Sequence, residues 1–406
     1  MKPALQSFDD ALAALIARAT TVAETEEVAT IEAAGRVLAR DQVSTLDVPP
    51  MDNTQMDGYA VRVADLAGDA PRLRVAQRIA AGHVGEPLAP GTAARIFTGA
   101  TIPPGADAVV MQEQVQPDGE HVVLGHRPAQ GEWIRRRGED ISAGSVILAA
   151  GARLGAQATG LAASVGVPSL TVRRRVRVAC LFTGDELLMP GEPLVPGAIY
   201  NSNRFVLTAL LRSLGCSVND LGIVPDSLEA TRDALRRAAS DNDLILTSGG
   251  VSVGEEDHVK PAVQAEGEID LWQIAMKPGK PLAYGRVRRG PAGFAHFIGL
   301  PGNPVSSFVT FALLARPFIL RLQGVSEVAP RAFDLRADFH WPRPDRRREF
   351  LRARVNGRGG LDLFAHQGSG VLTSTVWADG LVDNPPGKAI ARGDAVRFLP
   401  FTGLLS

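Results

Sequence analysis

The stretch DLILTSGGVSVGEEDHVK, residues 243–260, decides the fold: an apolar strand ends in Thr-Ser-Gly-Gly and leads through a further glycine into a helix. Ligands of parallel sheets bind outside the carboxyl ends of the strands, so this turn is expected at a ligand site. Gly249, Gly250 and Gly254 would let backbone N–H groups approach an anion at the positive end of a helix. The segment therefore predicts an anion-binding edge on an α/β sheet.

The same rhythm of strand, loop and helix extends to both sides of this stretch. Strand-like VRVACLF (176–182) precedes helix-like 203–215, and SVNDLGIV (217–224) precedes 227–240. The alternation predicts a three-layer domain with a parallel sheet over residues 176–326, which a long helix within 302–324 closes.

The remaining chain has a different texture on each side of this domain. Apolar spacing predicts helices at 5–19 and 25–40. Residues 46–140 carry short β-branched runs between Pro and Gly and predict a small β-rich domain. Short strands, turns and one helix are expected over 141–175. Alternating strands over 330–406, with no convincing helix, predict an antiparallel barrel or sandwich.

Bulk composition excludes several classes of protein. The 406 residues predict two to four domains, and the formal net charge of -1 gives no general attraction to nucleic acid or to an anionic membrane. Two cysteines, Cys180 and Cys216, cannot form a four-ligand zinc site and are expected to be buried. The N-terminus does not resemble a signal peptide, and no run of about 18 apolar residues occurs. We therefore expect a cytoplasmic protein.

Acidic residues follow each of three successive predicted strands. Asp185 and Glu186 follow the first strand, Asp226 follows the second, and a third group follows the glycine turn. The members of that third group are Glu255, Glu256 and Asp257. Carboxylates would repel an anion unless a divalent cation bridges them, and hard oxygen ligands favour Mg²⁺. The alternative is that they cap the helix dipole; this is favoured for Glu255, and both interpretations stay open for Asp257.

Lysine is scarce in this chain, yet two lysines flank one turn. The five lysines are Lys2, Lys260, Lys277, Lys280 and Lys388. In MKPGKP (276–281) the Pro-Gly turn lets Lys277 and Lys280 converge on one small oxyanion, whereas a solvated surface turn is the alternative; the scarcity of lysine favours the oxyanion. In GLPGNPVSS (299–307) Ser306 and Ser307 open a predicted helix; capping explains one serine, and a second oxyanion site explains the pair equally well.

In the β-rich segment, Asp52, Asp57, Thr98 and Glu113 lie in or near turns, and 135–140 is a dense charged group. Taken singly, each is better explained as a turn former or a surface ion pair. No Ser/His/Asp order, zinc spacing or Walker A loop is visible. The residues alone thus predict a Mg²⁺-assisted site for a phosphorylated ligand and a small oxyanion.

Seven motifs in this order resemble the MoeA-type molybdopterin molybdenumtransferases, a family that includes gephyrin and plant relatives, over residues 7 to 400. They are MDNTQMDGYAVR, FTGATIPPGADAVVMQE, RRRGEDI, TGDEL, TSGGVSVGEEDHVK, KPGKP and GLPGNPVSS. The resemblance implies an elongated, discontinuous N-terminal domain (1–45 and 141–175), whose first helix could pack on the α/β domain. It also implies an inserted β-rich domain (46–140), a molybdopterin-binding α/β domain (176–326) and a C-terminal β-barrel (330–406).

The resemblance further implies a homodimer whose active site lies between the α/β domain of one subunit and the β-rich domain of its partner. The implied reaction uses adenylylated molybdopterin and molybdate and releases AMP with the help of Mg²⁺. The implied metal and phosphate set is Glu186, Asp226 and Asp257. The implied oxyanion residues are Lys277, Lys280, Ser306 and Arg352, with Ser369 or Ser374 as the barrel serine. The implied contributions of the partner subunit are Asp57, Thr98 and Asp140; Ser248, Gly249 and Gly250 belong to the anion-binding turn.

Two rival functions share parts of this sequence. A molybdopterin adenylyltransferase uses the same α/β domain, but 175 further N-terminal residues and the barrel speak against it; such an enzyme is instead a candidate partner. A scaffold of the gephyrin kind would leave the acidic and lysine sets without a role. Tungstate resembles molybdate in size and charge, so the sequence does not distinguish the two metals.

Overall fold

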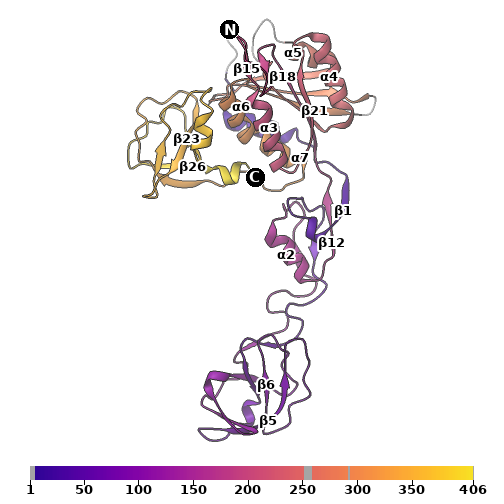
Figure 1. Ribbon diagram of the computed structural model, residues 1–406, viewed down its shortest axis with the longest axis vertical. Helices are drawn as coiled ribbons and strands as arrows, with labels where there is room; N and C mark the ends of the chain where they lie inside the picture. The colour runs from indigo at the N-terminus through magenta and orange to yellow at the C-terminus, as the bar shows by residue number, and fades with distance from the viewer. Residues whose placement is uncertain (1–4, 251–257, 291–292, 406) are drawn as a thin grey trace.

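The computed structural model describes residues 5–250, 258–290 and 293–405. Figure 1 shows an elongated molecule with the α/β and C-terminal parts at one end. A slender middle part carries α2, β1 and β12, and a β-rich domain with β5 and β6 lies at the opposite end. The chain thus runs out to the far domain and returns before it builds the α/β domain.

The central sheet of the α/β domain has six strands. Their order is β16 (Ser217–Val224), β13 (Arg177–Thr183), β17 (Leu244–Ser248), β21 (Phe294–Leu300), β20 (Pro281–Arg288) and β18 (Gly267–Gln273). The first four strands are parallel, but β20 pairs antiparallel with both of its neighbours. The three strands predicted from the sequence, β16, β13 and β17, are parallel as expected, and the antiparallel edge of β20 and β18 was not predicted. The connections 274–280 and 289–293 are too short for the crossover that parallel pairing requires.

Helices cover both faces of this sheet, which confirms the three layers. One face carries α1 (Phe8–Ala17), α3 (Ser202–Ser213) and one long helical run made of α6 (Pro304–Thr310), a π-helical turn (Phe311–Ala315) and α7 (Arg316–Leu322). The other face carries α4 (Leu228–Asp241) and α5 (Val259–Glu266). Alternate residues of β13 enter the two cores: Cys180 and Phe182 face the first, Ala179 and Leu181 the second.

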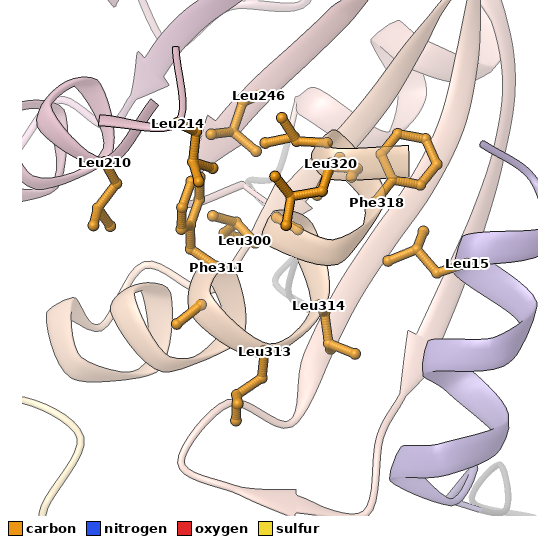
Figure 2. Packing of buried hydrophobic residues seen from close by; sticks show 14 of the residues in the cluster. Leu15, Leu210, Leu214, Leu246, Leu300, Phe311, Leu313, Leu314, Phe318 and Leu320 are labelled. Atoms are coloured by element: carbon orange, nitrogen blue, oxygen red, sulfur yellow. The ribbon is translucent and has the colours of Figure 1, made fainter. Parts of the chain in front are cut away.

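The long helical run is the centre of the larger core. Figure 2 shows Leu313, Leu314 and Phe318 from this run in the same core as Leu15 of α1 and Leu210 of α3. The helix Pro304–Leu322 is long and apolar enough to cross a membrane, yet 94% of its most apolar window is buried within the protein. It is therefore the core helix that the sequence predicts at 302–324.

The N-terminal segment forms one of the two predicted helices. Helix α1 begins after Ser7, whose Oγ accepts a hydrogen bond from the Asp10 N–H at 3.1 Å, and it packs on the α/β core. The predicted helix at 25–40 is wrong: β1 (Thr25–Ala29) pairs antiparallel with β12 (Ser169–Arg173), and only a 3₁₀ turn (Thr30–Glu32) follows. The partner strand supplies the backbone hydrogen bonds that a helix would otherwise make.

The middle and far parts are built from short strands. In the middle part, α2 spans Ala156–Ser164, and β2 (Gln42–Val43) pairs with β11 (Val146–Leu148). The pair β3 (Asn53–Thr54) and β10 (Ile134–Arg135) lies beside the far sheet. That sheet has the order β7 (Ala108–Met111), β4 (Gly58–Val61), β6 (Thr92–Ile96), β5 (Arg72–Ile79), β9 (His121–Leu124) and β8 (Val115–Asp118), with further 3₁₀ turns at Val63–Asp65 and Gln112–Gln114.

The C-terminal domain is a largely antiparallel sheet. Its order is β19 (Met276–Lys277), β23 (Arg348–Val355), β25 (Gly380–Asn384), β26 (Ala395–Pro400) and β22 (Phe333–Arg336), with β24 (Leu361–Leu363) on β23. Two short helices, α8 (Thr373–Trp377) and α9 (Phe401–Leu404), correct the expectation of no helix here. The small pair β14 (Leu187–Leu188) and β15 (Ile199–Tyr200) lies in the α/β part.

Leu314→Ala should lower the free energy of unfolding by about 2–5 kcal/mol, because Leu314 is fully buried and its loss leaves a cavity. The matched control is Leu228→Ala, which makes the same chemical change at a leucine that is 40% exposed. Urea denaturation followed by circular dichroism measures both variants. Equal losses in the two variants would contradict the placement of the core.

Candidate functional site

A cavity of about 700 Å³ opens at the carboxyl ends of β13, β17 and β21. The predicted site residues in its lining are Glu186, Ser248, Gly249, Gly250, Lys277, Lys280 and Ser306. The further polar or charged residues are Thr183, Tyr200, Asn201, Ser202, Asn203, Asn303, Arg347, Gln367 and Ser369. The α/β domain supplies most of the wall, and Arg347 and 367–369 come from the C-terminal domain.

Two glycines allow the backbone to follow the cavity wall closely. Gly250 has a φ of +65°, and a Cβ on it would lie 2.4 Å from Val259 Cγ2. Gly279, between the two lysines, has a φ of +103°, and a Cβ there would lie 2.2 Å from Thr310 Oγ1. Both positions require glycine for conformation and for space, so the two turns are held tightly against the core.

Two helices direct their N-terminal ends at the cavity. Asn201 caps α3 by accepting a hydrogen bond from the Arg204 N–H at 3.1 Å, and Asn201, Ser202 and Asn203 line the cavity. The run that begins with α6 presents Asn303 and Pro304. The Arg204 and Val305 N–H groups already have acceptors, but the dipoles of the two helices favour negative charge, so this part of the cavity suits a phosphate.

A hydrogen-bond network ties the strand ends to these helices. Asn203 Nδ2 donates to Ser248 Oγ at 2.8 Å and to the Gly302 carbonyl at 2.7 Å. Ser248 Oγ donates to the Pro301 carbonyl at 3.0 Å. Ser248 thus lies at the cavity as predicted, and its hydroxyl proton is used to hold the neighbouring loop.

Cations dominate the charge of the cavity. Its described lining contains three cationic side chains, Lys277, Lys280 and Arg347, and one carboxylate, Glu186. Lys280 is exposed and makes no ion pair within the described part of the chain. Lys277 Nζ lies 3.2 Å from Glu349 Oε1 and 3.5 Å from Asp345 Oδ2. The structure therefore brings the two predicted lysines together but gives only one of them an acidic partner.

The predicted metal set is brought together only in part. Glu186 lines the cavity and has no cationic partner among residues 5–250, 258–290 and 293–405. Asp226 follows β16 at the same edge of the sheet, half-buried, but does not line the cavity. Asp257, together with Glu255 and Glu256, lies outside the described residues. Within the described ranges, no group of three or more His, Cys, Asp or Glu residues could hold a metal ion.

Arg352 and Ser374 lie behind the cavity wall, not in it. Arg352 is fully buried and donates from Nε to Ser374 Oγ at 3.1 Å and from Nη2 to the Gly368 carbonyl at 3.1 Å. Gly368 itself lines the cavity. Arg352 and Ser374 therefore do not line this cavity, and their contact with a ligand stays a prediction. Of the two candidate serines, Ser369 is the one in the lining.

Asp57, Thr98 and Asp140 lie apart from the cavity. Thr98 donates to Asp57 Oδ1 from its N–H at 2.8 Å and from its Oγ1 at 2.7 Å. Both bonds hold the pKa of the Asp57 carboxyl below its usual range, and the bond from the Thr98 backbone N–H has the larger effect. Asp57 and Thr98 belong to the far β-rich domain (Figure 1), and the Asp140 N–H donates to the Val48 carbonyl at 2.9 Å. The structure pairs the first two but brings none of the three to the cavity of the same chain.

Several cavity residues were missed by the sequence prediction. Asn201 and Asn303 could have been found, since an asparagine directly before a helix is a known capping signal. Arg347 stands in a run of three arginines, and Gln367 in an irregular loop, so neither has a distinguishing spacing. Only the tertiary fold shows that they face the lysines.

The chain matches three successive family models. They are the MoeA N-terminal region (domain I and II) at residues 6–166, a probable molybdopterin binding domain at 179–321 and the MoeA C-terminal region (domain IV) at 334–401. A Haemophilus influenzae protein named molybdopterin molybdenumtransferase is 39% identical, over 98% of this chain and 99% of its own. A Mycobacterium tuberculosis protein named molybdopterin molybdenumtransferase 2 is 38% identical, over 87% of this chain and 89% of its own.

Solved structures agree with these sequence relatives. A crystal structure of the molybdopterin biosynthesis protein moeA from Pyrococcus horikoshii superposes with a TM-score of 0.84 at 27% identity, covering 98% of this chain and all of its own. A second structure of such a protein from the same genus gives 0.78 at 31% identity, over 98% of this chain and 99% of its own. The likeness therefore extends over all the domains.

Thr98→Val should raise the pKa of Asp57 partway towards its ordinary value. The substitution removes the hydroxyl donor and keeps the backbone donor, so the ionised carboxylate loses one of its two stabilising bonds. A ¹³C NMR titration of the carboxyl groups measures the change. Asp47, which accepts from the Ala143 N–H and from Arg137, should titrate as in the wild type. An unchanged pKa of Asp57 would contradict the hydrogen bond from the Thr98 hydroxyl.

Proposed function

This chain belongs to the MoeA family, and from that premise we propose that it is a molybdopterin molybdenumtransferase that combines molybdate with adenylylated molybdopterin and releases AMP. The observation that carries the proposal is the cavity at the carboxyl edge of the sheet. Its lining combines glycine-rich backbone, two helix N-termini and three cationic side chains. Both proposed substrates are anions, and the arrangement supports their binding side by side.

The phosphate side is proposed to hold the nucleotide-linked pterin. Gly249 and Gly250 leave the backbone open to close approach, and the N-terminal ends of α3 and α6 lie beside them. Fixed N–H groups bind phosphate oxygens without rearrangement. The Asn203–Ser248 hydrogen bond would keep these donors in place.

The cationic side is proposed to hold molybdate. Lys277, Lys280 and Arg347 would balance the charge of the dianion, and Ser306 lines the same region. Their contribution would be to place the oxyanion next to the dithiolene of the pterin, an effect of proximity and not of covalent catalysis. Lys280, which has no acidic partner among the described residues, is the cation most available to a ligand.

Arg352 and Ser374, which lie behind the cavity lining, are proposed as a second contact for molybdate. Burial lowers the pKa of the Arg352 guanidinium to about 10, and its hydrogen-bond partners are neutral oxygens. A buried cation without an acidic partner is costly, and an anion would relieve that cost. The loop of Gly368 would have to move for molybdate to reach it.

Mg²⁺ is proposed as the metal, with Glu186 and Asp226 as ligands together with Asp257. The fit is supported by Glu186, which among the described residues has no cationic partner and is the one carboxylate in the cavity lining, since hard oxygen donors of this kind suit Mg²⁺. When bound, the ion would neutralise the negative charge that develops on the departing AMP. The side chains themselves would orient the phosphates and hold the ligand shell at the strand ends.

A homodimer is proposed as the active form. Asp57, Thr98 and Asp140 lie away from the cavity of their own chain, and the domain of the first two is at the opposite end of the molecule (Figure 1), so a second copy would have to supply them. A closed two-fold dimer would complete two such sites at once. We further propose that the enzyme acts in the cytoplasm, with a molybdopterin adenylyltransferase as a candidate partner.

Mixing two inactive variants should restore molybdate-dependent AMP release. Asp57→Asn alters only the far domain of its subunit, and Lys280→Ala alters only the cavity. In a mixed dimer, one site therefore combines the unaltered cavity with the unaltered far domain, and the other site carries both substitutions. After subunit exchange, about a quarter of the wild-type rate is expected, because about half of the dimers are mixed.

Each variant alone is the control for this experiment, at the same total concentration. If subunit exchange is confirmed and the mixture still releases no AMP, the site is not shared between subunits. If the wild type consumed ATP with unadenylylated molybdopterin and released no AMP on addition of molybdate, the adenylyltransferase alternative would replace the proposal.

Glu186→Gln should raise the Mg²⁺ concentration needed for half-maximal AMP release by about tenfold or more, because an amide is a much weaker ligand than a carboxylate. Mg²⁺ titration of the rate, together with direct calorimetric titration of Mg²⁺, measures the effect. The control is Glu192→Gln, since Glu192 lies in the loop that follows Glu186 but does not line the cavity. The same Mg²⁺ requirement in both variants would remove Glu186 from the metal site.

A further inference from the structure

The lysine turn is attached to the C-terminal domain through its backbone. Strand β19 (Met276–Lys277) pairs in parallel with β23, with Met276 opposite Arg348 and Lys277 opposite Glu349. The Arg348 N–H also donates to the Ala275 carbonyl at 2.9 Å. Only after the turn does the chain enter β20 of the α/β sheet. The position of Lys277 therefore depends on the C-terminal sheet.

A buried carboxylate of that sheet holds the side chain of Lys277. The Glu349 side chain is 1% exposed and accepts hydrogen bonds from Lys277 Nζ at 3.2 Å and from Trp341 Nε1 at 2.7 Å. Asn384 Nδ2 lies 3.5 Å from the same carboxylate. The Lys277 side chain is 38% exposed and faces the cavity. Lys277 thus connects a buried anion on one side with the ligand space on the other.

The second acid beside Lys277 has a different main partner. Asp345 Oδ2 is 3.5 Å from Lys277 Nζ, but Asp345 accepts three hydrogen bonds from Arg347: from its N–H at 3.0 Å, its Nε at 3.1 Å and its Nη2 at 2.8 Å. Arg347 lines the cavity, and its guanidinium lowers the pKa of the Asp345 carboxyl well below the usual range. Asp345 therefore serves chiefly to fix Arg347, and Glu349 is the closer partner of Lys277.

We propose that Glu349 is a positioning residue: by holding Lys277 Nζ at the cavity wall, it makes the C-terminal domain set the geometry of the oxyanion side. The proposal rests on the proposed function in taking molybdate as the oxyanion. Glu349 itself does not line the cavity, so it acts only through Lys277. A lysine side chain has several rotatable bonds, and an ion pair with a buried carboxylate restricts them before the ligand arrives.

The proposal separates the two substrates. Without the charge of Glu349, Lys277 would sample orientations away from the cavity. Molybdate binding would then have to order the Lys277 side chain, and the entropy lost would weaken binding. The KM for molybdate should then rise by about tenfold, whereas kcat at saturating molybdate should change little. The KM for adenylylated molybdopterin should not change, because its proposed phosphate contacts lie at the glycine turn.

The test compares Glu349→Gln with Asp383→Asn. Both substitutions remove the charge of a buried carboxylate from neighbouring positions of one sheet, where Glu349 faces Asn384 and Phe350 faces Asp383. Asp383 accepts two hydrogen bonds from Arg348, at 2.6 and 2.7 Å, and makes no contact with Lys277. A higher KM for molybdate in Glu349→Gln only is expected. Equal increases in both variants would show a general effect of sheet stability and overturn the proposal.

Repeating Glu349→Gln in a Lys277→Ala background tests whether Glu349 acts through the lysine. If it does, the second substitution adds no further increase in the KM for molybdate. A full additional increase would overturn the proposal, because Glu349 would then act by another route.

Lysine NMR provides a readout that does not need turnover. The chain has only five lysines, so each resonance of ¹³C-dimethylated lysine can be assigned by substitution. The Lys277 resonance should move in Glu349→Gln and stay in place in Asp383→Asn; an unmoved resonance in Glu349→Gln would overturn the proposal. A moved resonance together with a wild type that releases no AMP would instead refute the proposed function and leave the Glu349–Lys277 contact standing.

Discussion

The carboxyl ends of three adjacent parallel strands are the constraint on which the rest of this structure depends. β13, β17 and β21 end at one edge, and the segments that follow β13 and β21 turn there before α3 and α6 begin at the cavity. The turns expose backbone N–H groups there, and the following helices begin there. An anion-binding surface thus follows from the topology before any side chain is considered.

The side chains then divide this surface into two halves with different origins. The glycine turn and the N-terminal ends of α3 and α6 belong to the α/β domain, whereas Arg347 belongs to the C-terminal domain. Lys277 lies on the boundary, since its backbone pairs with β23. The two domains are joined further by Arg348, which pairs with Asp9 and Asp383, and by the Val305 N–H, which donates to the Ser369 carbonyl at 2.9 Å. The cavity is therefore a product of how the two domains are docked.

The fold was predictable from the sequence where local pattern and tertiary structure agree. The alternation over 176–260 identified the parallel strands and their helices, because a buried strand and an amphipathic helix have distinct apolar spacings. The segment 25–40 misled the prediction, since its apolar spacing suits a helix but β12 offers a partner strand 140 residues later in the chain. The antiparallel direction of β20 was missed because strand composition does not show pairing direction, which depends on the length of the connection.

The site was predictable to the extent that its residues lie in turns with rare chemistry. Lys277 and Lys280 stood out because lysine is scarce, and Gly249 and Gly250 because only glycine fits such a turn. Glu349, Arg347 and Gln367 carry no such signal, since acids, arginines and amides are common throughout the chain and these three have no distinguishing spacing. Arg352 was assigned only through the resemblance, and its burial and its hydrogen bond to the Gly368 carbonyl are visible only in three dimensions.

The most direct test of the central claim is a crystal structure of the protein with adenylylated molybdopterin and molybdate, with anomalous data collected at the molybdenum edge. The account predicts a molybdenum peak beside Lys277 and Lys280, the pterin phosphates at Gly249 and Gly250, and Asp57 of the partner subunit over the same cavity. A molybdenum peak elsewhere in the molecule, with this cavity free of both ligands, would contradict it.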